Sequence, residues 1–204
     1  QILPFAVFIL FGLSWLAQMI YYWVVFSRLA FFRKRENAEK SQELAVSVVI
    51  CAKNEYQNLL NNLPAILEQD YPDFEVIVVN DASDDDSIEL LSSLSRKYNK
   101  LRIFNLEKNL NFFSGKKFPL SLGIKAAKNE ILLLTDADCR PSSPEWIRQM
   151  VSNYQGQTGI VLGYGTYKRT VGLLNQLIRY DAFMVAIHYF SFALAGAPYM
   201  GVGR

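Results

Sequence analysis

The sequence predicts an α/β protein in which helices cover both faces of a mainly parallel sheet, preceded by an N-terminal transmembrane helix. Two observations carry this prediction. From residue 46 onward, short β-branched runs alternate with segments of helical periodicity, as in chains of right-handed βαβ units. Before them, the run from Ile2 to Ser27 contains no charged residue and exceeds the roughly 20 apolar residues that a spanning helix needs.

Residues 1–32 are interpreted as a membrane anchor. The aromatic cluster at 21–23 fits the interfacial belt of a spanning helix, and basic residues follow at Arg28 and at 33–35. Because positive flanks stay in the cytoplasm, we expect the rest of the chain to be cytoplasmic. A signal peptide, which has a shorter apolar region, and a helix buried in a protein core are the alternatives. Residues 33–45 are charged and aperiodic, which is typical of a linker.

The segments that follow form one predicted domain over residues 46–170. Its first strand, "VSVVICA" at 46–52, is a continuous apolar run, as expected of a strand covered on both faces. Further strands are predicted over 74–80, 101–107, 130–136 and 159–165, and helices over 54–67, 87–98, 116–127 and 145–154. Leu132 to Leu134 are expected to be buried in a central strand.

Residues 171–204 are interpreted as the start of a further helical region. Polar residues at 175, 176 and 179 form a stripe against neighbouring leucines, and residues 182–200 are nearly all apolar. We favour an amphipathic helix on the membrane surface, with a second spanning helix as the alternative. The chain begins with Gln1 and ends on "YMGVGR", so we expect a fragment of a longer protein.

The composition excludes some classes of protein. With 204 residues and a formal net charge of +2, the chain lacks the basic balance of a nucleic-acid-binding domain. Two cysteines, Cys51 and Cys139, are too few for a disulfide framework or a zinc site, and are interpreted as reduced thiols.

Polar and acidic residues gather where the predicted strands end. The first strand is followed by Lys53-Asn54-Glu55, the second by "NDASDDD" at 80–86, and the fourth by Asp136 and Asp138. In open parallel sheets, ligands bind beyond the carboxyl ends of the strands. The sequence therefore predicts a binding site at this edge of the sheet.

Asp136 and Asp138 point to a divalent metal. Side chains two residues apart face the same side of a strand, and uncompensated like charges demand a counter-ion. Mg²⁺ and Mn²⁺ take oxygen ligands and often share them with substrate phosphates. We therefore predict a Mg²⁺ or Mn²⁺ site that holds a nucleotide diphosphate. For an Asp-x-Asp string taken alone, a solvated turn is the alternative.

Two further candidates lie near the same edge. Asp81 follows the second strand closely and is expected to accept a base N–H, whereas residues 84–86 with Glu89 are typical of a helix cap. Lys116 precedes a predicted helix and is placed to contact a diphosphate, with a solvated surface lysine as the alternative.

Four motifs occur in an order and spacing that resemble glycosyltransferase family 2. They are "VSVVICAKNE", "VIVVNDASDD", "SGKKFPLSLGIKAA" and "ILLLTDADCRP". The resemblance covers about residues 46–168. It implies the Rossmann-like GT-A fold, a UDP- or GDP-sugar donor, and inversion at the anomeric carbon.

The resemblance also implies roles for individual residues. Ala52 and Glu55 match nucleoside-contacting positions, Asp81 the acid that reads the base, Lys116 the basic residue near the diphosphate, and Asp136 and Asp138 the metal-binding pair, with Asp138 favoured as the direct ligand. Asn80 departs from the family, which often has a second acid at that position.

The catalytic base is the missing part. In the family, an acid follows a glycine-rich stretch like "GAPYMGVGR", so the resemblance places the base beyond Arg204. His188 is interpreted as a packed or interfacial histidine, and Asp181 as an acid on a helix surface. We therefore expect the fragment to lack transferase activity.

The predicted function is that of an inverting glycosyltransferase on the membrane. It would move a sugar to a membrane-associated lipid or polysaccharide and would not bind nucleic acid. A non-catalytic sugar-nucleotide sensor is the first alternative. A phosphoacceptor receiver module is the second, but it would need its acid pair after the first strand, where this chain has Lys53-Asn54-Glu55.

Overall fold

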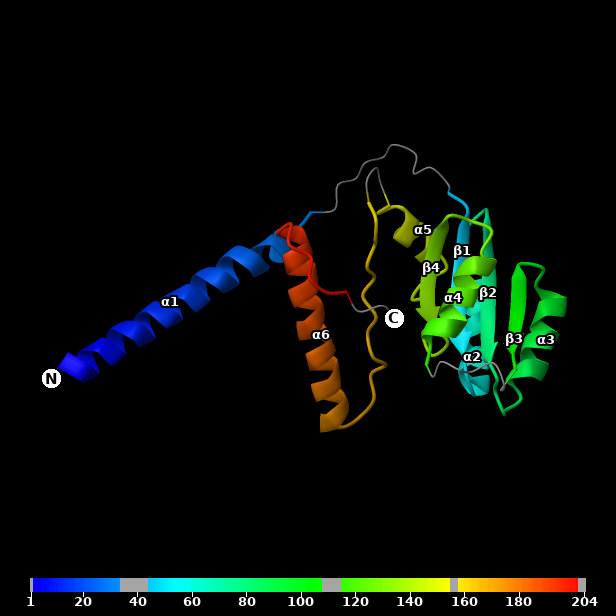
Figure 1. The fold of residues 1–204 in the computed structure, drawn as a ribbon, viewed down its shortest axis with the longest axis horizontal. Helices are drawn as coiled ribbons and strands as arrows, with labels where there is room; N and C mark the ends of the chain where they lie inside the picture. Colours follow the sequence, from blue (N-terminus) through cyan, green and yellow to red (C-terminus); the bar gives the residue numbers. More distant parts are fainter. Residues whose placement is uncertain (1, 34–43, 108–114, 155–157, 202–204) are drawn as a thin grey trace. The chain divides into compact units, whose positions relative to one another are not determined.

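The computed structural model describes residues 2–33, 44–107, 115–154 and 158–201 (Figure 1). These residues fall into two compact units. One is formed by the described residues between 44 and 163, and the other by residues 2–33 together with 164–201. Each unit is treated by itself below.

The first unit contains a four-stranded parallel sheet. Its strands are β1 (Val46–Ala52), β2 (Phe74–Asp81), β3 (Leu101–Leu106) and β4 (Ile131–Asp136), arranged in the order β3-β2-β1-β4 (Figure 1). The register pairs Ala52 with Asn80 and Cys51 with Asp136, so β1, β2 and β4 end at one edge. These four strands and their parallel pairing confirm the predicted fold class.

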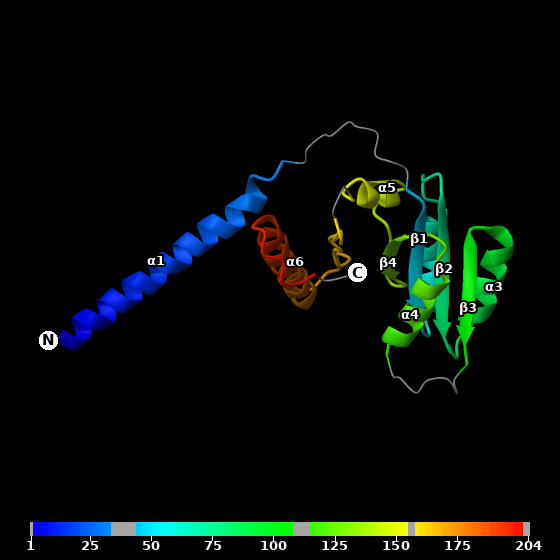
Figure 2. The same ribbon diagram turned by 45° about the horizontal axis from the view of Figure 1, so that its top comes forward.

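Helices cover both faces of this sheet, as predicted. One face packs against α2 (Tyr56–Leu67), α3 (Ser87–Lys97) and α5 (Trp146–Val151), which bury Leu59, Leu91 and Ile147 respectively. The other face packs against α4 (Lys117–Ala126) (Figure 2). Phe118 and Leu122 of this helix pack against the buried cluster of Ile77, Val79 and Leu106. The β-branched residues of β1 and β2 are buried because both faces are covered.

Gly123 brings α4 close to the sheet. A Cβ atom at this position would lie 2.5 Å from Val49 Cγ1 and 3.2 Å from Val79 Cγ2, closer than van der Waals contact allows. Only glycine therefore permits this packing distance. The helix begins directly after Lys116, whose ammonium lies beside Asp136 at the carboxyl edge of the sheet.

The prediction that Leu132 to Leu134 lie buried in a central strand is wrong about the position of the strand, and of the three only Leu133, at 9% exposure, is buried in the core. Within the described sheet, β4 is an edge strand that pairs only with β1. Leu134 pairs with the buried Val49 across the ladder, but 44% of Leu134 is exposed. An apolar run shows that a strand is hydrophobic but does not show where it lies in the sheet.

The predicted fifth strand at 159–165 is also wrong. No described residue between 158 and 171 belongs to a strand, and Ile160 is 80% exposed. Gly159, Gly163 and Gly165 lack side chains that could pack against a neighbour, and glycine weakens a strand. A strand also needs a ladder partner, and none of the described strands pairs with this segment.

A buried polar network closes the amino edge of the sheet. Glu75 on β2 accepts hydrogen bonds from Ser47 Oγ at 2.7 Å, from Arg102 Nη1 at 2.8 Å and from the Lys128 N–H at 2.7 Å. Arg102 also donates to the Ala126 carbonyl at 2.8 Å. One carboxylate thus joins β1, β2, β3 and the end of α4, at the edge opposite the candidate site.

The second unit contains two long helices, α1 (Ile2–Ala30) and α6 (Leu173–Leu194). Their aromatic side chains meet in pairs, Tyr21 with Phe192 and Phe26 with His188. His188 is packed, as expected, and its Nδ1 lies 2.7 Å from the Met184 carbonyl oxygen. By length and composition, Pro4–Ala30 and Leu173–Leu194 are the two candidate membrane spans among the described residues.

Candidate functional site

The site begins where β1 and β2 end. Asn54 and Ala82, in the turns after these strands, have positive φ angles of 55° and 49°. The Asn54 N–H donates to Ser83 Oγ at 2.9 Å, and Asn54 Oδ1 accepts from the Asp84 N–H at 2.8 Å. Left-handed backbone costs a non-glycine residue about 1–2 kcal/mol. The hydrogen bonds between the two turns hold this backbone in place.

Asp85 fastens the same two turns to the helices that follow them. Its carboxylate accepts from the Tyr56 N–H at 3.0 Å, at the start of α2, and from the Ser87 N–H at 3.2 Å, at the start of α3. Burial raises the pKa of Asp85, but these hydrogen bonds and that of the Ser87 hydroxyl outweigh it, so the pKa is lowered. The capping role expected for residues 84–86 therefore belongs to Asp85.

Asp81 is the last residue of β2 and is 9% exposed. The Lys53 ammonium lies 3.6 Å from Asp81 Oδ2, so the acid faces the end of β1. Ala52, its neighbour there, is buried at 2% exposure. The neighbouring Asn80 donates from Nδ2 to Asn105 Oδ1 at 3.2 Å, which makes it part of the sheet's internal hydrogen bonding.

Asp136 and Lys116 meet at the end of β4. The Lys116 ammonium lies 3.1 Å from Asp136 Oδ1, and Gly115, with a φ of 107°, turns the chain just before it. Burial lowers the pKa of Lys116, but the hydrogen bond and the charge of Asp136 outweigh it and raise the pKa. Lys116 is therefore a cation at the very edge where the sequence predicts a diphosphate.

Cys51 lies at the centre of these charged groups. It pairs with Asp136 across the β1–β4 ladder. The pKa of its thiol is raised to about 11: burial is the main cause, Lys116 lowers the pKa, and Asp136 and Asp81 raise it. A raised pKa keeps a thiol protonated at neutral pH and makes it a poor nucleophile.

The remaining two predicted residues lie at the rim. Asp138 is exposed in the turn after β4, where the Cys139 N–H donates to the Asp136 carbonyl oxygen at 3.1 Å. Glu55 stands at the N-cap of α2 and accepts from Asn58 Nδ2 at 2.6 Å. The structure thus brings Asp81, Lys116 and Asp136 together around Cys51.

Three residues of the site were missed as participants. Lys53 pairs with Asp81, Asn54 links the two turns, and Cys51 occupies the middle. The signal for Asn54 is its residue type, because asparagine is enriched in left-handed backbone just after a strand. The positions of Lys53 and Cys51 follow from the register of three strands, which the sequence does not give.

The residues present fit a divalent cation that shares its ligands with a substrate. Among the described residues, no group of three His, Cys, Asp or Glu side chains is placed to hold a metal alone. Asp136 and Asp138 supply carboxylate oxygens, which suit Mg²⁺ or Mn²⁺, and these ions commonly complete their coordination with water and phosphate.

Comparisons with known proteins show the family to which the chain belongs. Residues 47–190 match the profile of the family described as Glycosyl transferase family 2. The chain is 30% identical over 128 residues to a poly-beta-1,6-N-acetyl-D-glucosamine synthase from Staphylococcus epidermidis, covering 59% of this chain and 30% of that protein. It is 32% identical over 143 residues to glycosyltransferase AglE from Haloferax volcanii, covering 68% and 44%.

A solved structure shares the fold. The mannosyltransferase PcManGT from Pyrobaculum calidifontis, in complex with GDP-Man and Mn²⁺, matches with a TM-score of 0.58 and 25% identity, covering 71% of this chain and 42% of that one. The chain thus spans less than half the length of these relatives.

Proposed function

The chain belongs to glycosyl transferase family 2, and we propose that Asp81, Lys116 and Asp136 mark the site where its protein binds a nucleotide-diphospho sugar for transfer. The observation that carries the proposal is the ion pair between Lys116 and Asp136, 3.1 Å apart at the carboxyl edge of a parallel sheet. That edge is where α/β sheets bind nucleotides. The Lys116 ammonium would balance the negative charge of a diphosphate, and the Asp136 carboxylate would supply an oxygen ligand to a metal ion.

The donor would lie across the ends of three strands. Asp81, with Ala52 and Glu55 on the β1 side, would contact the base and nucleoside, and Lys116 would contact the diphosphate. Asp136 and Asp138 would hold Mg²⁺ or Mn²⁺, which neutralises charge on a departing diphosphate when bound. The solved relative with GDP-Man and Mn²⁺ supports a donor of this kind.

The reaction proposed is an inverting transfer to a lipid or polysaccharide acceptor at a membrane. The site residues named here bind the donor and help the leaving group depart, and inversion also needs a base for the acceptor hydroxyl. A relative named for poly-beta-1,6-N-acetyl-D-glucosamine supports a polysaccharide. The two long apolar helices support a membrane location, with α1 as the anchor.

Thermal unfolding of the whole chain in detergent micelles tests the donor site. UDP, GDP and CDP would each be added with and without Mn²⁺. A ligand at a hundred times its Kd stabilises the folded state by about 2.7 kcal/mol, so the preferred base should be recognisable from the melting temperatures. We expect one uridine or guanosine nucleotide to raise the melting temperature, and Mn²⁺ to increase that rise.

Matched substitutions make this test specific. Asp138→Asn should remove the increase caused by Mn²⁺, whereas Asp73→Asn, an exposed acid just before β2, should leave it unchanged. If no nucleotide raises the melting temperature, or if Asp138→Asn keeps the full effect of Mn²⁺, the proposal fails. Nucleotide binding without turnover by a longer form of the protein would instead favour a sensor.

A further inference from the structure

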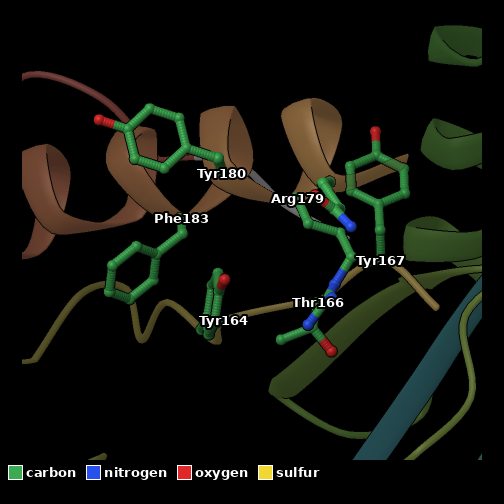
Figure 3. A pocket seen from close by; sticks show the side chains of 7 residues that line it. Tyr164, Thr166, Tyr167, Arg179, Tyr180 and Phe183 are labelled. Carbon is green, nitrogen blue, oxygen red and sulfur yellow. The ribbon is translucent and has the colours of Figure 1, made fainter. Parts of the chain in front are cut away.

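A pocket lies within the unit that contains α6. It has a volume of about 300 Å³, at the lower end of the range for pockets that hold small molecules. Its lining residues are Tyr164, Thr166, Tyr167, Gln176, Arg179, Tyr180 and Phe183 (Figure 3). None of these belongs to the donor site proposed above.

The pocket is built from one helix face and one facing segment. Gln176, Arg179, Tyr180 and Phe183 follow the spacing i, i+3, i+4, i+7, so they share a face of α6. The facing segment is tied to the helix by Asn175, which accepts from the Thr170 N–H at 3.0 Å and donates to the Lys168 carbonyl at 3.1 Å.

Arg179 gives the pocket an uncompensated positive charge. Asp181 is the one acid among the described residues of this unit, and it is exposed. No ion pair or side-chain hydrogen bond joins Arg179 to any residue that the structure describes. Figure 3 shows Arg179 extending from α6 toward the segment that carries Thr166, with Tyr167 beside it. A guanidinium with free donors suits a phosphate or carboxylate.

Aromatic rings line the rest of the pocket and are only partly covered. Tyr164, Tyr180 and Phe183 are 43%, 63% and 49% exposed. None of these three rings pairs with another ring in the described part of the chain. Tyrosine offers an apolar face with a polar tip, so it can stack on a ring and still form hydrogen bonds.

We propose that this pocket binds an anionic saccharide, a sugar ring that carries a phosphate. Arg179 would contact the phosphate, the aromatic rings would stack on the sugar, and Gln176 and Thr166 would contact its hydroxyls. Lys168 and Arg169, exposed on the same segment, add to the positive charge nearby. The binding of a sugar phosphate here does not depend on the donor site and is tested without turnover.

The test is a titration of the whole chain, in micelles of a non-ionic detergent without a sugar head group. The probe is glucose 1-phosphate, with glucose and inorganic phosphate as comparisons, and binding is measured by isothermal titration calorimetry. The nucleoside diphosphate that raises the melting temperature most is present throughout, with Mg²⁺, to occupy the donor site. We expect glucose 1-phosphate to bind more tightly than either comparison compound, because it uses both parts of the pocket.

Substitutions distinguish the contribution of the Arg179 guanidinium from that of the aromatic rings. Arg179→Gln should raise the Kd for glucose 1-phosphate about tenfold and leave that for glucose unchanged, with Arg179→Lys in between. Tyr180→Ala should weaken both ligands, and Tyr180→Phe should restore most of the binding. Arg96→Gln removes the same charge from the exposed side of α3 and should change nothing.

Other outcomes decide against the inference. If Arg179→Gln leaves the Kd for glucose 1-phosphate unchanged, or if inorganic phosphate binds equally well, the pocket does not recognise a sugar phosphate. The nucleotide-induced rise in melting temperature is measured on the same samples. A failure of donor binding is therefore distinguished from a failure of binding at this pocket. Phosphatidylinositol added to the micelles shows whether the natural ligand is a lipid head group or a free glycan. If it competes with glucose 1-phosphate, the ligand is a lipid head group, and if it does not compete, the ligand is a free glycan.

Discussion

The Lys116 ammonium lies 3.1 Å from Asp136 Oδ1 and joins the start of α4 to the end of β4. Both side chains are well exposed, at 71% and 39%. An exposed ion pair contributes about 0–1 kcal/mol, so it is readily exchanged for other partners. A divalent cation at Asp136 would replace the ammonium there, and Lys116 would then be free to contact the phosphates that arrive with the metal.

Lys116→Gln should weaken nucleotide binding at the diphosphate. With Mn²⁺ present, we expect the Kd for the preferred nucleoside diphosphate to rise about tenfold, because a charge-assisted contact is lost. The Kd for the matching nucleoside should hardly change. Isothermal calorimetry on both ligands measures the two effects.

Lys117 provides the control for that experiment. It follows Lys116 directly, is exposed, and has no ion pair among the described residues. Lys117→Gln therefore removes the same charge from nearly the same place. Equal losses in both variants would mean that general electrostatic attraction, rather than the position of Lys116, explains the result.

Cys51 should react slowly with alkylating reagents. Burial, together with Asp136 and Asp81, raises its pKa from 9.0 to about 11. The reactive thiolate is therefore about a hundredfold scarcer at pH 8 than for an ordinary cysteine, and its fraction should keep rising until the pH approaches 11. Mass spectrometry of the Cys139→Ser protein, alkylated without added metal, measures Cys51 alone. A rate that levels off near pH 9 would contradict the prediction.

Glu75→Gln should destabilise the sheet at its amino edge. The lost carboxylate accepts three hydrogen bonds, one from Arg102, and we expect a cost of about 2–4 kcal/mol at pH 7. Denaturant unfolding followed by circular dichroism measures it. Glu130→Gln, at an exposed site before β4, is the control and should change stability by less than about 0.5 kcal/mol.

The same substitution should change the response to acid. Burial raises the pKa of Glu75, but the hydrogen bonds from Arg102, Lys128 and Ser47 outweigh it, so the pKa is lowered in the folded state. Its stabilising contribution is therefore complete above the unfolded pKa of about 4.3 and is lost as the pH falls through the folded pKa. Glu75→Gln should flatten that part of the stability profile, and an unchanged slope would count against the network.

Gly123→Ala should destabilise the protein although alanine favours helices. The new Cβ would lie 2.5 Å from Val49 Cγ1, so the sheet or α4 must shift. Overpacking typically costs about 1–3 kcal/mol, which exceeds the gain of about 1 kcal/mol in helix propensity. Ser121→Ala, on the exposed side of α4, provides the comparison in the same unfolding experiment. A more stable Gly123→Ala protein would show that the helix is not held close to the sheet.

The local pattern of apolar residues was sufficient to predict most of the helices and strands. The β-branched runs that became β1 and β2 and the apolar spacing that became α2 and α3 are properties of neighbouring residues, and the structure confirms them within two residues. Pattern failed where the outcome depends on distant partners. The sequence "GIVLGYG" has strand-like residues, but no described strand pairs with it, and Leu134 is exposed because β4 lies at an edge.

The residues of the candidate site also divide into those that local sequence could predict and those that it could not. Asp81, Lys116 and Asp136 could be selected because each follows or precedes a recognisable element, and parallel strands bring such ends together. Cys51 and Lys53 join them only through the β1–β2 and β1–β4 registers. Spacing along the chain cannot supply a register, so the thiol at the centre could not be predicted.

Asp85 has a consequence for how the site adapts to its ligand. One carboxylate receives the first N–H groups of two helices, at Tyr56 and Ser87, so the turns after β1 and β2 cannot move independently. The half of the site that we propose to hold the base is therefore pre-organised by these hydrogen bonds. The phosphate side depends on the exposed contact between Lys116 and Asp136, which exchanges easily. Recognition would then proceed from a rigid half of the site that selects the nucleoside to a compliant half that adjusts to the metal.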